Sequence, residues 1–327
     1  PPFIAYGIGN GLHLPLSCGM EVILIPQFDP NKFDELLLEN KPNHMVGVPS
    51  HYGNIIHSKK LKNEDLSYVI APTVGGDKMD ENLEKETNEF LHEHNCEYKV
   101  VKGYGMTEVN AAVAACTSNE TNKIGSVGIP FPNTTISIFD PKTGEELGYN
   151  EKGEVCITGP NTMLGYFNND EETNKILRKH EDGNVWVHSG DIGYMDADGN
   201  LYIVDRLKRM IIRPDGFKIF PSLIEDVVVK HPLVQSCKVV GLRDFSFSQG
   251  KLPKVHAVLN ETDRNPEAIE NEILMLCEEQ LPEYYWPCEI EFNESLPLTP
   301  IGKIDYLKLE KEDYEKQLAA TKKLVKK

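Results

Sequence analysis

Between residues 21 and 105, short apolar runs rich in β-branched residues alternate with longer segments of helical periodicity. The apolar runs predict strands at residues 21–26, 45–48, 68–71 and 98–101. The segments between them predict helices, the clearest of which are residues 29–40 and 79–95. Strands that alternate with helices form a parallel sheet covered by helices. An α/β fold built on a parallel sheet is therefore expected for this region.

Two glycine-containing turns directly follow predicted strands of this sheet. The first holds Gly75, Gly76 and Asp77, and the second holds Gly103, Tyr104 and Gly105. Open parallel sheets bind ligands beyond the carboxyl ends of their strands. A ligand site is therefore expected where these turns lie.

The sequence changes character after residue 122. Residues 123–205 hold short strand-like runs punctuated by glycine, proline and asparagine, which predict a small antiparallel sheet or barrel. Beyond Arg206, the pattern predicts a separate α+β unit, with helices from residue 221 and at 267–280 and strands at 236–241, 254–259 and 289–292.

These patterns give a predicted domain organisation. Residues 1–206 form a large domain, with a parallel-sheet αβ subdomain at about 1–122 and a small β-barrel-like subdomain at about 123–206. Residues 207–327 form a small α+β C-terminal domain.

Charge and apolar content limit the possible functions. The chain has 34 Lys and Arg residues against 51 Asp and Glu residues, a formal net charge of −17, so no nucleic-acid partner is expected. With 40% hydrophobic residues it can bury a core, yet no apolar run approaches the roughly 20 residues of a membrane-spanning helix, so no transmembrane segment is expected. Seven scattered cysteines without a C-x-x-C pair suit a reducing compartment, which predicts a cytoplasmic protein.

The segment from Tyr104 to Glu108 gathers four chemically useful groups within five residues. A nucleotide could use all of them, because the ring of Tyr104 can stack on a purine and Gly105 allows close approach. The hydroxyl of Thr107 can donate to a phosphate oxygen, and the carboxylate of Glu108 can hold Mg²⁺. Taken alone, the segment could equally be a strand-to-helix turn capped by Thr107.

Three further segments are informative only in combination. Asp191 follows a predicted strand and could accept two hydrogen bonds from a ribose diol, although alone it is a turn residue. A cationic cluster at residues 206–209 leads to Gly216 at the predicted domain junction. Lys303 follows a glycine, a pattern that usually marks a surface turn. The phosphate-loop pattern G-x-x-x-x-G-K-[ST] is absent from the sequence.

Together, in this order and at this spacing, the motifs resemble those of the adenylate-forming superfamily of AMP-binding enzymes. That superfamily includes acyl-CoA synthetases, adenylation domains of peptide synthetases and firefly luciferase. The resemblance covers nearly the whole chain. It is carried by Gly75-Gly76, Tyr104 to Glu108, Gly153-Glu154, Gly165-Tyr166, Gly190-Asp191, Arg206, Gly216 to Glu225 and Gly302-Lys303.

The resemblance implies a nucleotide site made of Gly75, Gly76, Asp77, Tyr104, Gly105, Asp191, Ile203 and Arg206. In that site the backbone at Gly75 and Gly76 lies against adenine, and Tyr104 stacks on the other face. Asp191 binds the ribose hydroxyls with help from Arg206, while Ile203 packs near the nucleoside.

The resemblance also implies catalytic roles for Lys303, Thr107 and Glu108. Thr107 contacts phosphate, Glu108 coordinates Mg²⁺, and Lys303 bridges the substrate carboxylate and the α-phosphate, where negative charge develops. The small C-terminal domain is then mobile, with its hinge at Lys208, and it brings the loop at Gly216 to the tunnel for CoA. Because residues 213–215 depart from the common family pattern, no further CoA contacts are assigned.

The acyl pocket is expected near Ile4, Tyr6 and Gly7. Amino-acid-activating relatives place an aspartate directly after the residue that matches Phe3, whereas this chain has Ile4. An uncharged residue cannot pair with a substrate ammonium, so an amino-acid substrate is disfavoured. A fatty or other apolar carboxylic acid is expected instead.

The resemblance therefore predicts an ATP-dependent acyl-CoA synthetase that uses ATP, Mg²⁺, CoA and a small carboxylic acid, and that forms acyl-AMP before the thioester. One alternative is an adenylating ligase that loads the phosphopantetheine of a carrier protein. Another is a catalytically silent nucleotide-binding fragment. The family's Ser/Thr/Gly-rich phosphate loop is expected upstream of residue 1, so the chain is expected to be the C-terminal three-fifths or so of a longer enzyme.

Overall fold

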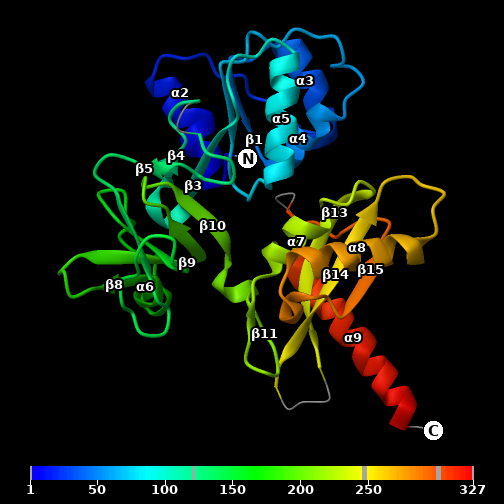
Figure 1. Ribbon diagram of the computed structural model, residues 1–327. Helices are drawn as coiled ribbons and strands as arrows, with labels where there is room; N and C mark the ends of the chain where they lie inside the picture. Colours follow the sequence, from blue (N-terminus) through cyan, green and yellow to red (C-terminus); the bar gives the residue numbers. More distant parts are fainter. Residues whose placement is uncertain (1, 120–121, 245–248, 300–302, 326–327) are drawn as a thin grey trace. The chain divides into compact units, whose positions relative to one another are not determined.

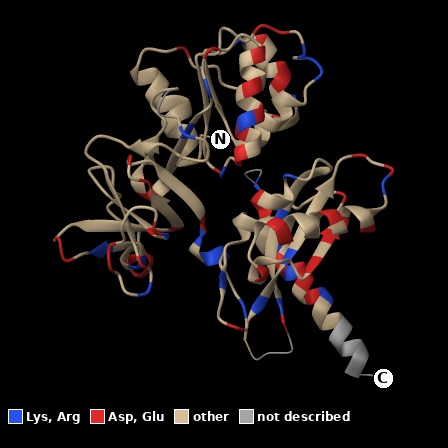
Figure 2. Cartoon of the chain, viewed as in Figure 1, with Lys and Arg blue, Asp and Glu red and all other residues tan. Residues whose placement is uncertain are grey.

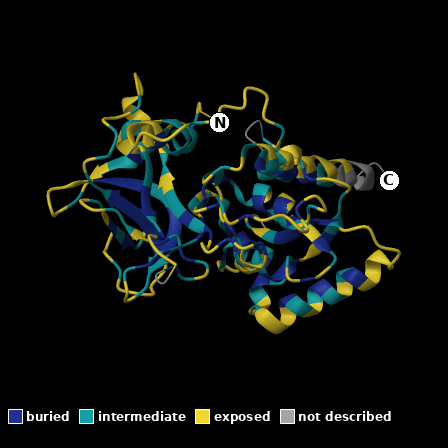
Figure 3. Ribbon diagram, turned by 90° about the horizontal axis from the view of Figure 1, so that it is seen from above, coloured by how far each residue is buried: buried dark blue, intermediate teal, exposed yellow. Residues whose placement is uncertain are grey.

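The computed structural model describes residues 2–119, 122–244, 249–299 and 303–325. The chain divides into two compact units, Pro1–Ile203 and Val204–Lys327. Figure 1 shows the elements of each unit, and Figure 3 shows buried residues on the strands of both units and on the inner faces of their helices.

The first unit contains a five-stranded sheet with the order β1-β2-β3-β4-β5. Its strands are β1 (His44–Gly47), β2 (Ala71–Val74), β3 (Val101–Met106), β4 (Ala111–Ala115) and β5 (Ile129–Pro130). β1, β2 and β3 pair in parallel, which confirms the predicted parallel sheet. β4 and β5 extend it with antiparallel pairing, which the sequence pattern did not indicate.

Helices cover this sheet and bury its core. They are α3 (Phe33–Asn40), which follows the short turn η2 (Pro30–Lys32), α4 (Pro49–Ile56) and α5 (Glu81–Glu93). α5 begins where the side chain of Asp80 accepts the backbone N–H groups of Asn82 and Leu83, as an N-cap residue does. Leu37 and Leu91 are among the side chains that pack into the core beneath these helices.

A further helical stretch opens the described chain and consists of α1 (Ala5–Ile8), the π-helical turn η1 (Gly9–His13) and α2 (Leu14–Ser17). In Figure 1 it lies on the face of the sheet opposite α3, α4 and α5. A Cβ atom on Gly9 would lie 3.0 Å from the Cβ of Ala111, so this stretch packs closely on β4.

Four strand predictions in this unit are corrected by the structure. The runs at 68–71 and 98–101 lie just before the strands that form, because β2 begins at Ala71 and β3 begins at Val101. Residues 21–25 form no strand, because none of the described strands pairs with this run. Leu24, within the run, is 66% exposed. Apolar β-branched sequence becomes a strand only where a neighbour supplies hydrogen bonds. Tyr104 and Gly105 lie inside β3 rather than after a strand, because β3 continues past the parallel sheet to pair with β4.

The predicted small antiparallel subdomain is confirmed. Its sheet has the order β10-β9-β7-β6, with β8 paired to β9. Its elements are β6 (Thr135–Phe139), β7 (Gly153–Thr158), α6 (Asp170–Ile176), β8 (Leu177–Lys179), β9 (Val185–Met195) and β10 (Leu201–Arg206). Val155, Val187 and Leu201 are fully buried in its core, which Val113 of β4 also joins.

The second unit is the predicted α+β fold. Its sheet joins β13 (Val234–Arg243), β14 (Lys251–Leu259) and β15 (Glu289–Phe292), with an antiparallel and then a parallel pairing. Around it lie η4 (Leu207–Arg209), β11 (Ile211–Ile212), β12 (Lys218–Ile219), α7 (Pro221–Val228), α8 (Pro266–Gln280), η5 (Glu283–Tyr285) and α9 (Tyr306–Val325). Ile224 of α7 and Ile273 of α8 are fully buried in its core.

Charged residues are unevenly distributed along these elements. Acidic residues recur along α5 and α8, while basic residues occupy the short segment that follows β10 (Figure 2). Across the residues that the structure describes, no helix combines the length and apolar character needed to cross a membrane.

Candidate active site

Tyr104 and Asp191 lie side by side in the first unit. The Tyr104 hydroxyl donates a hydrogen bond to Asp191 Oδ2 at 2.7 Å, although the two residues are 87 positions apart in the sequence. Tyr104 comes from β3 and Asp191 from β9, so the contact joins the two sheets of the unit. The structure thus brings together a predicted purine-stacking ring and a predicted ribose-binding carboxylate.

Asp191 lies inside β9, in an irregular part of the strand, and not after a strand as predicted. Glu154 pairs with Ile192 and Cys156 pairs with His188, so three residues of β9 stand opposite one residue of β7. Gly190, at the centre of these three, has φ of +68°, a left-handed conformation that glycine adopts without steric cost. Bulges of this kind re-aim side chains, and here the bulge carries Asp191.

Gly75 and Gly76 directly follow β2, as predicted. A Cβ atom on Gly75 would lie 2.9 Å from the ring of Tyr6, so only glycine leaves room for that ring. The Tyr6 hydroxyl donates to the carbonyl oxygen of Gly47 at 3.2 Å, and burial raises the pKa of the phenol well above its usual value. The predicted acyl-pocket residue Tyr6 therefore contacts the predicted adenine-binding turn.

The remaining residues predicted at these places have simpler environments. Asp77 is exposed, and its carboxylate accepts the backbone N–H of Lys78 at 2.9 Å. Ile4 is the N-cap residue of α1 and Gly7 lies within α1, both half-buried. Ile203 is half-buried on β10.

Gly105 is required by the close approach of β3 to β4. A Cβ atom there would lie 1.6 Å from the carbonyl oxygen of Ala111, so no other residue fits this backbone. The pairing of the two strands also shifts register between Tyr104 and Gly105. Gly105 thereby fixes the position of its neighbour Tyr104.

Thr107 and Glu108 lie in the 3₁₀ turn η3 (Thr107–Val109), directly after β3. Thr107 is exposed, and Glu108 is half-buried. The Tyr166 hydroxyl donates to Glu108 Oε1 at 2.5 Å. Burial and the Glu108 carboxylate together raise the pKa of Tyr166 to about 12, so the phenol stays protonated and serves as a donor.

Tyr166 has no role in the sequence-based site, although the pair Gly165-Tyr166 is part of the motif set. Local contacts hold Tyr166 in place: Gly165 has φ of +150°, and the Tyr166 backbone N–H donates to Thr173 Oγ1 at 2.8 Å. This turn presents the phenol to Glu108. A glycine–tyrosine pair before a short helix could have suggested such a fixed ring.

The donor set at η3 fits Mg²⁺. Glu108 offers a carboxylate and Thr107 a hydroxyl at adjacent positions, which are hard oxygen ligands of the kind that Mg²⁺ takes from proteins along with phosphate and water oxygens. Oε2 of Glu108 has no hydrogen bond to another described residue, whereas Oε1 is occupied by Tyr166. Two other clusters of metal-ligating side chains occur among the described residues, and neither includes Glu108.

The other predicted site residues, Arg206, Lys208, Gly216 and Lys303, all belong to the second unit. Arg206 and Lys208 are exposed at the end of β10 and in η4. Gly216 lies at the turn between β11 and β12 with φ of +86°. Their roles in the nucleotide site stay predictions.

The predicted hinge residue Lys208 lies between two anchored neighbours. Before it, the Asp205 carboxylate accepts the Ser222 backbone N–H at 2.8 Å. After it, Arg209 donates to Asp205 at 3.1 Å and to Glu225 at 2.5 Å. Backbone rotation at Lys208 would break the contacts of Asp205 with both Ser222 and Arg209.

Lys303 lies in a tight loop. Its carbonyl oxygen accepts the Thr299 N–H at 2.7 Å, and its own N–H donates to Thr299 Oγ1 at 3.2 Å. Its side chain is half-buried. Gly302, the other residue of this motif, lies outside the described residues.

These residues correspond to a known family. Residues 1–167, half of the chain, match the family described as AMP-binding enzyme. The chain belongs to this family of AMP-binding enzymes. Residues 223–303 of this AMP-binding enzyme match the AMP-binding enzyme C-terminal domain. The resemblance to the adenylate-forming superfamily is thereby confirmed.

The chain is similar to several curated CoA ligases. It is 33% identical over 315 residues to a long-chain-fatty-acid–CoA ligase of Bacillus subtilis, across 96% of the chain and 53% of that protein. It is 35% identical over 306 residues to the probable 4-coumarate–CoA ligase 1 of Dictyostelium discoideum, across 93% of the chain and 53% of that protein. The chain spans about half the length of the curated relatives it matches.

A solved structure gives the same fold. ATP-bound MatB from Rhodopseudomonas palustris superposes with a TM-score of 0.83 and 25% sequence identity, across 95% of this chain and 58% of that one. The mixed α/β architecture with a small second domain is thus that of the adenylate-forming enzymes.

Proposed function

We propose that this AMP-binding enzyme supplies the nucleotide site of an AMP-forming CoA ligase. The contact between Tyr104 and Asp191 carries the proposal, because it joins a stacking ring and a diol-binding carboxylate in one site. CoA ligases among the relatives support the same reaction class.

The proposed reaction has two steps. In the first, an oxygen of the substrate carboxylate bonds to the α-phosphorus of ATP, and pyrophosphate leaves with the electron pair of the broken bond. In the second, the sulfur of CoA bonds to the acyl carbon, AMP leaves, and the thiol proton passes to solvent. Both steps need one nucleotide held in a fixed position.

The proposed nucleotide site uses residues from several separate segments of the sequence. Gly75, Gly76 and Asp77 lie against adenine, and Tyr104 stacks on its other face. Asp191 accepts hydrogen bonds from the ribose hydroxyls. The predicted neighbours Gly105, Ile203 and Arg206 complete the site.

The phosphates are bound through η3. Thr107 donates to a phosphate oxygen, and Glu108 would hold Mg²⁺, which neutralises phosphate charge when bound. Lys303 places a cation beside the substrate carboxylate and the α-phosphate, where charge builds up in the first step.

The domain boundary at 206 and 207 remains part of the proposal. Lys208 is the hinge of a mobile C-terminal domain, and Gly216 lines the path of the CoA thiol. These roles rest on the family resemblance of the motifs.

The acid is proposed to be apolar. Ile4, Tyr6 and Gly7 offer no charge for a substrate ammonium, and both named relatives are ligases of acids with a largely apolar body. A fatty or aryl acid is the substrate class, and free CoA is the acceptor. Transfer to a carrier protein would require the thiol of its phosphopantetheine instead.

Pyrophosphate release tests the proposal. The full-length protein is incubated with ATP, Mg²⁺ and fatty, aryl and amino acids, with Lys303→Ala as the control. Release that depends on a fatty or aryl acid and is reduced at least about 100-fold in the control supports the proposal. Release with amino acids alone, or thioester formation only on a carrier protein, would reject the substrate or acceptor class. The absence of any release would favour a silent nucleotide-binding chain.

A further inference from the structure

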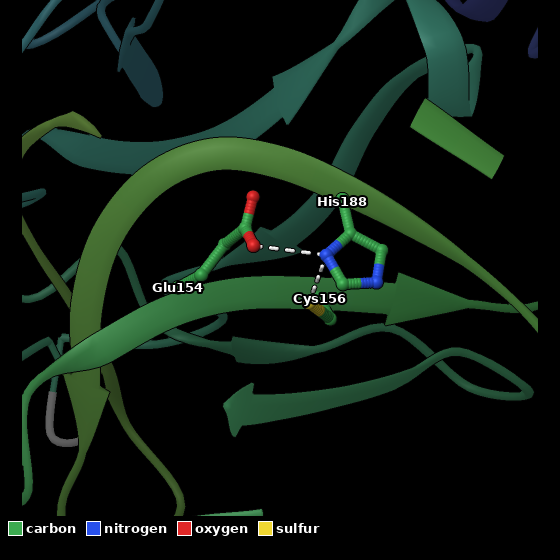
Figure 4. A group of neighbouring side chains, drawn as sticks. All are labelled: Glu154, Cys156 and His188. Atoms are coloured by element: carbon green, nitrogen blue, oxygen red, sulfur yellow. Dashed lines mark hydrogen bonds and ion pairs between the residues drawn. The ribbon is translucent and has the colours of Figure 1, made fainter. Parts of the chain in front are cut away.

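Three buried side chains meet where β7 pairs with β9, the strand that carries Asp191. Glu154 and Cys156 extend from β7, and His188 faces them from β9 (Figure 4). His188 Nδ1 lies 2.8 Å from Glu154 Oε2 and 3.5 Å from Cys156 Sγ. Glu154 is 5% exposed and His188 is 7% exposed, so both polar groups are almost wholly removed from water.

The second oxygen of Glu154 reaches the bulge of β9. Gly190 donates its backbone N–H to Glu154 Oε1 at 3.1 Å. The buried carboxylate therefore divides its two oxygens between the imidazole of His188 and the backbone next to Asp191. A hydrogen bond to a charged acceptor in a buried place is stronger than a neutral one, so this contact is well suited to fix a loop.

The hydroxyl of Ser189 completes the bulge. Ser189 Oγ donates to the carbonyl oxygen of Val155 at 2.6 Å and accepts the backbone N–H of Asp191 at 3.0 Å. Each of the three β9 residues that stand opposite Val155 is thus held by a side-chain hydrogen bond. Without these bonds, the extra residues would lack the ladder contacts that fix an ordinary strand.

The hydrogen bonds also determine how His188 is oriented. An ionised carboxylate only accepts, so His188 Nδ1 carries the proton that it shares with Glu154. His188 Nε2 lies 2.9 Å from His180 Nε2. Burial raises the pKa of Glu154, but the hydrogen bonds from His188 and Gly190 outweigh burial, and the pKa lies below its usual value. Glu154 is therefore charged at neutral pH.

We propose that Glu154 is a positioning residue, which holds the Ser189–Asp191 bulge so that the Asp191 carboxylate is aimed at the ribose of a bound nucleotide. The proposal rests on the proposed function, because it takes the ribose as the ligand of Asp191. Glu154 acts through Gly190 and His188 keeps Glu154 in place, so neither needs to touch the nucleotide.

The arrangement favours this role over a metal site. Glu154, Cys156 and His188 place donor atoms within 4.8 Å of one another, as metal ligands do. Yet both carboxylate oxygens and both ring nitrogens already have hydrogen-bond partners in the described residues. A metal ion would have to displace the Gly190 or His188 contact and deprotonate the Cys156 thiol, whose pKa burial raises well above its usual value.

Selectivity for the ribose hydroxyls gives the test. Dissociation constants of AMP and of 2′,3′-dideoxy-AMP are measured by calorimetry for the 327-residue chain and for Glu154→Ala. We expect the unaltered chain to bind AMP at least about 10-fold more tightly than the dideoxy nucleotide, since each lost hydrogen bond to a charged group weakens binding. In Glu154→Ala that ratio should fall below about 3, with affinity for the dideoxy nucleotide nearly unchanged.

Two further variants separate positioning from general loss of structure. Cys156→Ala opens a small cavity in the same cluster but removes no contact of the bulge, so it should lower the unfolding temperature and keep the ratio. In an Asp191→Asn background, Glu154→Ala should have no further effect on the ratio, because residues that act in series are not additive. Glu154→Gln keeps an acceptor for Gly190, so its ratio should lie between those of Glu154→Ala and the unaltered chain. It is the second variant to measure if Glu154→Ala folds poorly.

The outcomes are distinct. If the unaltered chain prefers AMP and the Glu154 variants keep the full preference, the positioning role is overturned and the proposed function stands. If the unaltered chain binds both nucleotides equally or neither, the role of Asp191 fails and both proposals are overturned. Stoichiometric binding of Zn²⁺ that is abolished by Cys156→Ala would assign the cluster to a metal and also overturn the inference.

Discussion

The phenol of Tyr166 donates a hydrogen bond to Glu108 Oε1 at 2.5 Å and leaves Oε2 without a hydrogen bond to another described residue. The contact orients a half-buried carboxylate that is proposed to hold Mg²⁺. Because the pKa of Tyr166 is raised to about 12, the donor persists over the whole physiological pH range.

Tyr166→Phe should therefore weaken the use of Mg²⁺. The variant keeps the ring and removes only the donor, and a hydrogen bond to a charged group contributes about 1.5–3 kcal/mol. We expect the Mg²⁺ concentration for half-maximal pyrophosphate release to rise about 10-fold. Tyr149→Phe, at a tyrosine that is 66% exposed, is the matched control. An unchanged Mg²⁺ requirement in Tyr166→Phe would contradict the role of this contact.

Two variants of Tyr104 should separate its ring from its hydroxyl. Tyr104→Phe removes the 2.7 Å bond to Asp191 but keeps a stacking surface, so AMP affinity should fall only about 3- to 10-fold. Tyr104→Leu also removes stacking, worth about 1–3 kcal/mol per base, and should weaken AMP further. Calorimetry on both variants checks the order, and equal losses would argue against stacking on this residue.

Gly75→Ala should destabilise the turn that follows β2. The added methyl would lie 2.9 Å from the ring of Tyr6, which has to move because the neighbouring backbone is fixed by β2. Overpacking of this kind costs about 1–3 kcal/mol of unfolding free energy. Gly53→Ala in α4 is the control, since its methyl meets nothing within 4 Å and should be neutral or slightly stabilising. Urea unfolding measures both, and equal stability of the two variants would show that the ring of Tyr6 moves away freely.

A salt bridge in the β subdomain predicts a pH effect on stability. Burial raises the pKa of Asp196. The ammonium of Lys123, 2.7 Å away, and hydrogen bonds from Asn200 lower it by a larger amount, so that the pKa is about 2. A carboxyl with a depressed folded pKa stabilises the fold above its unfolded value of about 3.9, and this contribution is lost as the pH falls toward 2.

Asp196→Asn should therefore lower the unfolding free energy by about 1–2 kcal/mol at pH 7, a figure reduced for solvent screening. The difference from the unaltered chain should shrink between pH 4 and pH 2. Asp198 contacts the same Lys123 ammonium, but its side chain is 76% exposed. Asp198→Asn should therefore change the unfolding free energy by less than about 0.5 kcal/mol. Urea unfolding at several pH values checks both, and a pH-independent difference would count against the salt bridge.

The hinge at Lys208 can be tested through the two half-reactions. Lys208→Pro fixes a backbone dihedral in η4, next to Asp205 and Arg209, which are tied to the second unit. We expect acyl-AMP formation and thioester formation to change by different factors, with one slowed at least about 10-fold. Lys208→Ala leaves the backbone free and is the control. Unchanged rates of both half-reactions in Lys208→Pro would remove the hinge assignment.

Much of the architecture follows from local patterns. Residues 236–241 and 289–292 form strands where the sequence predicts them, because β-branched residues fit a half-buried sheet surface. Residues 21–25 have the same character and form no strand, because a strand depends on a partner that local sequence does not specify. For the same reason the pairing of β3 with β4, which places Tyr104 inside a strand, was not predicted.

The candidate site likewise has features that the sequence determined and features that it did not. Sequence by itself determined which chemical groups are present, because ring, hydroxyl and carboxylate are properties of Tyr104, Thr107, Glu108 and Asp191 as residues. It also determined the family, since motif order and spacing are sequence properties.

Only the tertiary structure decided which of these groups meet. Tyr104 and Asp191 are 87 residues apart and touch because a bulge in β9 turns the carboxylate toward β3. Glu154 and Tyr166 gained roles because their partners, Gly190 and Glu108, come from other segments of the chain. Contacts between distant segments depend on how sheets pack and where strands slip register, and neither leaves a local pattern in the sequence.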